Sequence, residues 1–199
     1  MKSNVCKIEK GTKDLEAILK ESEKVAVYNG LNNKQTLHLR LLCEELDGML
    51  PEIVGDFQGD LWFDFEGDTC KLNVSIDIAE INLQNKEQLI EVAKNKRNAA
   101  AVGIIGKIRC AIENVFLDED LINAMAMSSG AYSMAPGYYD GHDCSYYWSL
   151  EQYRNSVKKE EAAEAWDELE KSVIASVADD VIVGIKGNHA DIVIVKKFA

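Results

Sequence analysis

The sequence contains no apolar run that approaches the roughly 18 residues a membrane-spanning helix requires. Its first residues, from Met1 to Cys6, also lack the apolar core of a signal peptide. Positive charge is scarce, because 22 lysines and arginines stand against 34 aspartates and glutamates, for a net charge of -12. A general nucleic-acid binder needs clustered positive charge, so we expect neither nucleic acid nor a membrane as a partner.

Cysteines are few, odd in number and widely spread, and no C-x-x-C pair occurs among the five. Cys43 and Cys110 fall on apolar helical patterns, which predicts small buried side chains rather than reactive thiols. The three histidines show no metal-ligand spacing, and His142 with its neighbours is best explained as a polar loop. We therefore expect a cytoplasmic protein, kept reduced and without a metal site.

The length of 199 residues, 47% of them hydrophobic, suits a single domain over residues 1–199. Apolar and polar side chains alternate on both sides of the Gly67–Asp68 turn, which predicts an antiparallel hairpin over 61–78. A second hairpin is predicted over 181–195, with its turn at Gly187–Asn188. Helical spacing predicts helices over the ranges 14–24, 33–50, 85–92, 104–115 and 162–177.

Two signals in the sequence predict where the second of these helices begins and ends. Asn32 or Asn33 can cap its first turn, and Pro51 follows its last periodic residue. Its apolar stripe includes Leu42, Leu46 and Met49, with Glu45 at the rim.

The segment from about 117 to 153 differs from the rest, because it combines turn signals with a concentration of aromatic residues. Irregular segments of this length are often lids or binding segments. We predict a lid-like insertion at about 117–153, whose contacts to a ligand or partner include Tyr138, Tyr139, Tyr147 and Trp148. The alternative is that these aromatics pack into the core.

The order of helix, helix, hairpin, helix, lid-like segment, helix and hairpin resembles the ATP-binding domain of the GHKL superfamily. This superfamily includes histidine kinases, gyrase, Hsp90 and the anti-sigma-factor serine kinases. Two segments carry the resemblance: the helix through 39–49 and the closing helix and hairpin through 172–198. The resemblance implies an α/β two-layer sandwich, with a mixed, mainly antiparallel sheet and helices on one face.

The resemblance also implies roles for individual residues. Glu45 matches the glutamate that acts as a base, but Met49 stands where the family has its magnesium-binding asparagine. If Glu44 is aligned instead, Gly48 takes that position. Asp77 matches the aspartate that accepts a hydrogen bond from adenine, although both glycines of that motif are absent. The alternative for the glutamates and for Asp77 is an ordinary solvent-facing position.

The family's phosphate-binding lid has its counterpart in Gly103, Gly106 and Lys107, for which close helix packing is the alternative. The resemblance thus predicts a regulatory protein with weak or altered nucleotide binding, in which any ATP binding is weak and depends little on magnesium. If it is active, it is an ATP-dependent serine/threonine protein kinase. The alternative is a non-catalytic module that binds another protein or a small molecule and has lost ATP binding. The sequence leaves open whether the protein forms a homodimer.

Overall fold

The computed structural model describes residues 1–10, 15–54, 56–80, 145–160, 172–186 and 188–198. In chain order the elements are β1 (Cys6–Glu9), α1 (Leu15–Tyr28), α2 (Asn33–Val54), β2 (Asp56–Glu66), β3 (Thr69–Glu80), β4 (Ser145–Ser149), α6 (Leu150–Glu160), α8 (Val173–Val177), β5 (Asp180–Lys186) and β6 (His189–Lys197). No helix in these ranges has the length and apolar character needed to cross a membrane. The helices predicted over 85–92 and 104–115 lie outside the described residues.

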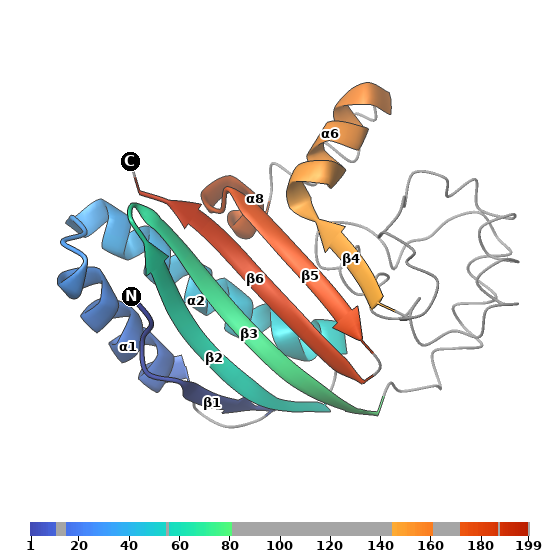
Figure 1. The fold of residues 1–199 in the computed structure, drawn as a ribbon, viewed down its shortest axis with the longest axis horizontal. Helices are drawn as coiled ribbons and strands as arrows, with labels where there is room; N and C mark the ends of the chain where they lie inside the picture. Colours follow the sequence, from blue (N-terminus) through green and yellow to red (C-terminus); the bar gives the residue numbers. More distant parts are fainter. Residues whose placement is uncertain (11–14, 55, 81–144, 161–171, 187, 199) are drawn as a thin grey trace, which may run out of the picture.

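The described strands form one six-stranded sheet in the order β1-β2-β3-β6-β5-β4 (Figure 1). The two predicted hairpins therefore belong to one sheet, because β3 of the first pairs with β6 of the second. Every pair of neighbouring described strands is antiparallel, so the prediction of a mixed sheet is wrong for these strands. The physical reason is that tight turns reverse the chain within both hairpins, and the two hairpins meet through oppositely directed strands.

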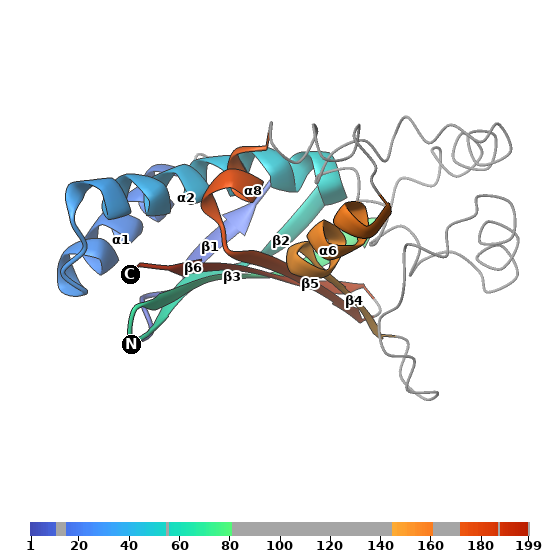
Figure 2. The same cartoon turned by 90° about the horizontal axis from the view of Figure 1, so that it is seen from above.

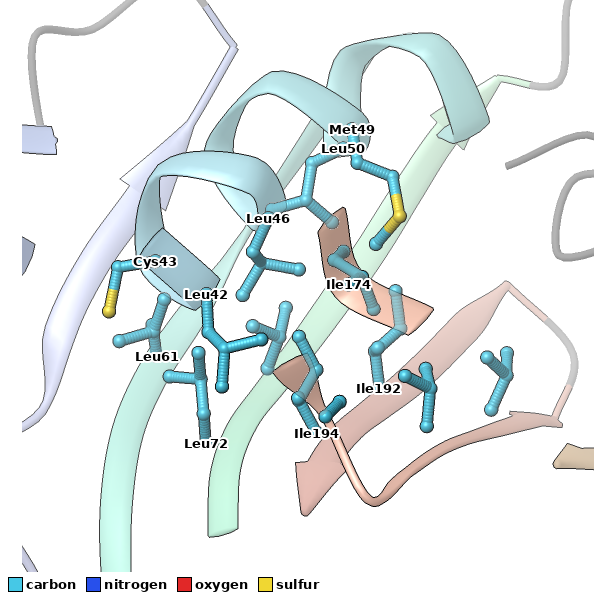
Figure 3. Packing of buried hydrophobic residues seen from close by; sticks show 14 of the residues in the cluster. Leu42, Cys43, Leu46, Met49, Leu50, Leu61, Leu72, Ile174, Ile192 and Ile194 are labelled. Carbon is cyan, nitrogen blue, oxygen red and sulfur yellow. The ribbon is translucent and has the colours of Figure 1, made fainter. Parts of the chain in front are cut away.

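The helices α1, α2 and α8 lie on one face of the sheet, which gives the two-layer α/β arrangement expected from the sequence (Figure 2). The core lies between these layers. Figure 3 shows side chains of α2 above those of the sheet, among them Leu42, Leu46, Leu61, Leu72 and Ile192. Fully burying one such side chain stabilises the fold by about 1.5–3 kcal/mol, so this interface holds the two layers together.

The helix α2 begins with a reciprocal cap. The side chain of Asn32 accepts a hydrogen bond from the Gln35 amide at 3.0 Å, and the Gln35 side chain accepts one from the Asn32 amide at 2.9 Å. The cap is therefore Asn32. Pro51 lies inside the helix, so the prediction that the helix ends before it is wrong. The helix continues because Ile53 and Val54 extend its buried face.

The C-terminal helical segment is not one continuous helix to Val177, as predicted, because Ser172 has an extended backbone and caps the separate short helix α8. The hydroxyl of Ser172 accepts a hydrogen bond from the Ala175 amide at 3.3 Å. Residues 162–171 of the predicted helix lie outside the described part. The buried side chains of α8 are those of Ile174 and Ala175, whereas the predicted Val177 is half-buried. Because α8 begins after Ser172 as a separate helix, the side of it that is buried differs from the predicted one.

Candidate functional site

The inner face of α2 is closed by hydrophobic packing where the resemblance places a metal-binding residue. Met49 is only 1% exposed and belongs to the buried cluster. Figure 3 shows its side chain pointing from α2 towards Ile174 of α8, which belongs to the same buried cluster. A thioether is a poor ligand for a hard cation such as magnesium. Among the described residues, no group of three or more histidines, cysteines, aspartates or glutamates could hold a metal.

The two glutamates of α2 have different surroundings. Glu45 is exposed on the helix surface. The Oε1 atom of Glu44 lies 3.1 Å from Nε of Arg40, and Nη1 of the same arginine lies 3.0 Å from Oε1 of Glu23 on α1. Such a solvent-exposed network contributes at most about 1 kcal/mol per pair. Glu44 thus takes part in linking α1 to α2, while Glu45 remains in solvent.

Asp77 lies on the opposite face of the sheet from α2. Its neighbours in β3, Ile76 and Ile78, are buried in the core that faces the helices. Successive side chains of a strand point to opposite faces. The Asp77 side chain, 82% exposed, therefore points away from the helical layer. The structure does not bring Glu45 and Asp77 together, because the sheet lies between them.

A polar cluster that spans β3 and β6 surrounds Asp77 on this open face. Nδ1 of His189 lies 2.8 Å from Oδ1 of Asp77, and Nε2 of the same ring lies 2.9 Å from Oγ of Ser75. The Ser75 hydroxyl donates a hydrogen bond to Oδ1 of Asp191 at 2.6 Å. Asp77 pairs with His189 in the strand register, and Ser75 pairs with Asp191. We call these four residues the histidine cluster.

The cluster shifts the titration of its histidine. The hydrogen bond to Asp77 is the largest cause that raises the pKa of His189 above its ordinary value, and the charge of Asp191 acts in the same direction. Partial desolvation of the ring opposes both effects. The cluster was not found from the sequence, although alternation does place Ser75 and Asp77 on one face of β3. The missing information was the pairing of β3 with β6, which joins residues more than 100 positions apart.

The structure describes two of the four residues predicted to be lid contacts, Tyr147 and Trp148. Tyr138 and Tyr139 lie outside the described residues, as do Gly103, Gly106 and Lys107 of the predicted phosphate-binding segment. Tyr147 lies in β4, opposite Gly184 of β5.

Trp148 is 8% exposed and belongs to the core cluster, with its ring 6.2 Å from that of Tyr153. Residues 145–153 form β4 and the start of α6, so the prediction of an irregular segment up to 153 is wrong for this part. Pairing with β5 gives these residues regular structure. The alternative, that these aromatics pack into the core, therefore describes the position of Trp148.

The helix α6 is anchored to the rest of the fold by polar contacts. The guanidinium of Arg154 donates hydrogen bonds to the carbonyl oxygens of Ala175, Ala178 and Asp179, at the end of α8. The amide of Glu151 donates to the side chain of Asp180 at 2.9 Å. The contact to Ala175 satisfies a carbonyl in the last turn of α8, where a helix has no partner of its own for its carbonyls.

Two of the three described thiols have the properties of core residues. Cys43 and Cys70 are both buried, as predicted for Cys43. Burial raises the pKa of the Cys43 thiol far above its ordinary value and raises the pKa of Cys70 to about 12. Since the thiolate is the reactive form, neither residue is a candidate nucleophile at neutral pH.

The most exposed of the large apolar side chains in the described residues lie at the end of α1. Val27 is 81% exposed and Tyr28 is 74% exposed. They border an open depression that Lys20, Glu23 and Lys24 also line. Sequence reasoning did not single out these two residues, because the helix predicted there ended at residue 24, whereas α1 continues to Tyr28.

No family model, no curated protein and no solved structure matches this chain. The resemblance to GHKL domains therefore rests on the sequence segments and the order of elements, and it stays a prediction.

Proposed function

We propose that this protein is a regulatory, protein-binding module built on a histidine-kinase-type ATPase fold that has lost magnesium-dependent ATP chemistry. The observation that carries the proposal is the burial of Met49. At the position where the resembling family has a metal-binding asparagine, this side chain is 1% exposed and belongs to the hydrophobic core. A metal-bound phosphate would need oxygen ligands and open space at the same place.

The position of Asp77 supports the same proposal. In the resembling family the aspartate and the glutamate face one nucleotide. Here the carboxylate of Asp77 accepts a hydrogen bond from His189 on the open face of the sheet, while Glu45 lies in the helical layer. Binding of one nucleotide to both residues would require the sheet to rearrange, which would break its core packing.

The exposed end of α1 supports a protein as the partner. Tyrosine is enriched at protein interfaces, since it offers a large apolar area together with a hydroxyl group. Val27 and Tyr28 present such an area in an otherwise strongly acidic protein. A small-molecule site would require a more enclosed cavity, and the depression bordered by these residues is open.

Thermal-shift titration with ATP, ADP and a nonhydrolysable analogue, each with and without magnesium, tests the loss of ATP chemistry. A ligand that binds only the folded protein raises the melting temperature as its concentration exceeds the dissociation constant. We expect no magnesium-dependent rise with any of the nucleotides. Tight ATP binding that requires magnesium in calorimetry would contradict the proposal.

The two glutamates of α2 supply a matched pair of variants for an assay of ATP hydrolysis. If the wild type does hydrolyse ATP, Glu45→Gln should abolish the activity, since the amide cannot act as a base. Glu44→Gln is the control, because Glu44 is already held by Arg40. An equal effect of both variants, or of neither, would remove Glu45 as the base.

A further inference from the structure

The hydrogen bonds of the histidine cluster show which atoms carry protons, because each bond requires one hydrogen on its donor. The hydroxyl of Ser75 has one hydrogen, and it donates this hydrogen to Asp191 at 2.6 Å. Towards His189, 2.9 Å away, the same oxygen can then only accept. It follows that Nε2 of His189 carries a hydrogen.

The second ring nitrogen leads to the same conclusion. Nδ1 of His189 lies 2.8 Å from a carboxylate oxygen of Asp77, and an ionised carboxylate is only an acceptor. Nδ1 therefore carries a hydrogen as well. A histidine that donates from both nitrogens is an imidazolium, so the four side chains fit together only when the ring is charged.

We propose that the histidine cluster is a proton-dependent clasp that holds β3 against β6 when His189 is charged and loosens when the ring loses a proton. The clasp lies where the turn between β5 and β6 meets the end of β3, since the Ile78 amide also donates to the Asn188 carbonyl at 2.9 Å. It is independent of the proposed function and requires no ligand.

Loss of one proton changes the hydrogen bonds in a defined way. The remaining hydrogen stays on Nδ1, where Asp77 offers a carboxylate acceptor. Nε2 then becomes an acceptor that faces Oδ1 of Asp191 at 3.3 Å, and two acceptors repel each other. The Ser75 hydroxyl can relieve this repulsion only by turning from Asp191 to Nε2, which leaves Asp191 without its hydrogen bond from Ser75.

The charged groups around the ring come from three strands. Asp77 on β3 and Asp191 on β6 favour the charged ring, and Lys186 of β5 stands opposite His189 in the register. The balance raises the pKa of His189, with the Asp77 hydrogen bond as the largest cause. The clasp therefore contributes fully below the ordinary histidine pKa of the unfolded chain. Its contribution is lost as the pH rises through the higher pKa of the folded protein.

Nitrogen and proton NMR of the histidine side chains in the full chain, from about pH 5.5 to about pH 9, tests the clasp. We expect both ring nitrogens of His189 to be protonated at the low end and its titration to occur above the ordinary range. Asp77→Asn should move the titration to lower pH. Asp68→Asn is the matched control, since it changes an aspartate at the other end of β3.

A second measurement keeps the test valid if one variant folds poorly. The free energy of unfolding of the wild type should exceed that of His189→Gln at low pH, and the difference should shrink as the pH rises. His38→Gln, which removes a histidine outside the cluster, should leave the pH dependence unchanged. Equal titration of His189 in the wild type and in Asp77→Asn, or a stability difference independent of pH, would overturn the proposal.

Discussion

A methyl group has no room at Gly59, in the middle of β2. A Cβ atom built there would lie 2.2 Å from the carbonyl oxygen of Ser75 and 2.8 Å from Cα of Ile76. Both atoms belong to the backbone of the neighbouring strand, so they cannot move aside as a flexible side chain would. Close approach of two backbones is a recognised reason for glycine within a strand.

We expect Gly59→Ala to lower the free energy of unfolding by about 1–3 kcal/mol, the range typical of overpacking. Urea denaturation measures the change. Gly48→Ala is the control, because a Cβ atom at this position of α2 meets nothing within 4 Å. There alanine should stabilise the helix by about 0.5–1 kcal/mol. Equal effects of the two substitutions would show that β2 and β3 do not approach as closely as described.

At the scale of a single element, the start of α2 gives a clear test of the relation between sequence and structure. Two asparagines in succession both suit a helix cap, and only the hydrogen bonds identify Asn32 as the cap. Asn33 is already the first residue of the helix.

Asn32→Ala should lower the free energy of unfolding by about 1 kcal/mol, since it removes the acceptor for the Gln35 amide. Asn33→Ala changes the same residue type one position later and should have little effect or be slightly stabilising. Thermal or urea denaturation of the two variants in parallel measures the difference. A larger loss in Asn33→Ala would place the cap one residue later.

At the scale of the whole molecule, the exposed end of α1 is the surface to test for a partner protein. We expect the double variant Val27→Ser, Tyr28→Ser to fold normally, because both side chains are mostly exposed. A partner identified by cross-linking to the wild type and then purified should bind the double variant at least about 10-fold more weakly, a loss of 1.4 kcal/mol.

Val5→Ser is the matched control, because Val5 is also an exposed apolar residue but lies outside α1, directly before β1. It should leave the affinity unchanged. Equal binding of the wild type and the double variant would show that the partner uses a different surface.

The sequence predicted those parts of the fold whose signals are local. The alternation on both sides of Gly67–Asp68 predicted β2 and β3, because each strand buries one face and turns tightly at a glycine with a φ of 59°. The apolar stripe of α2 predicted its buried face, from Leu42 to Met49. The end of α2 was predicted too early, since Pro51 was given more weight than the buried Ile53.

The candidate site was less predictable because its contacts join distant parts of the chain. Glu45 and Asp77 were assigned by resemblance to one nucleotide site, yet they lie in different layers. A strand pattern says which residues share a face, but it does not say which face the helices will cover. Trp148 was placed in a lid for a related reason: its burial depends on β4 pairing with β5, which the sequence around it does not show.

The sequence by itself therefore determined the hairpins, the apolar face of α2 with Met49 on it, and the acidic balance, since each depends on neighbouring residues or on composition. Only the tertiary structure decided that the sheet is antiparallel across its described strands, that Asp77 points away from α2 and that His189 lies between two carboxylates. These features arise from the pairing of β3 with β6, whose register is set by burying both strands under the same helices.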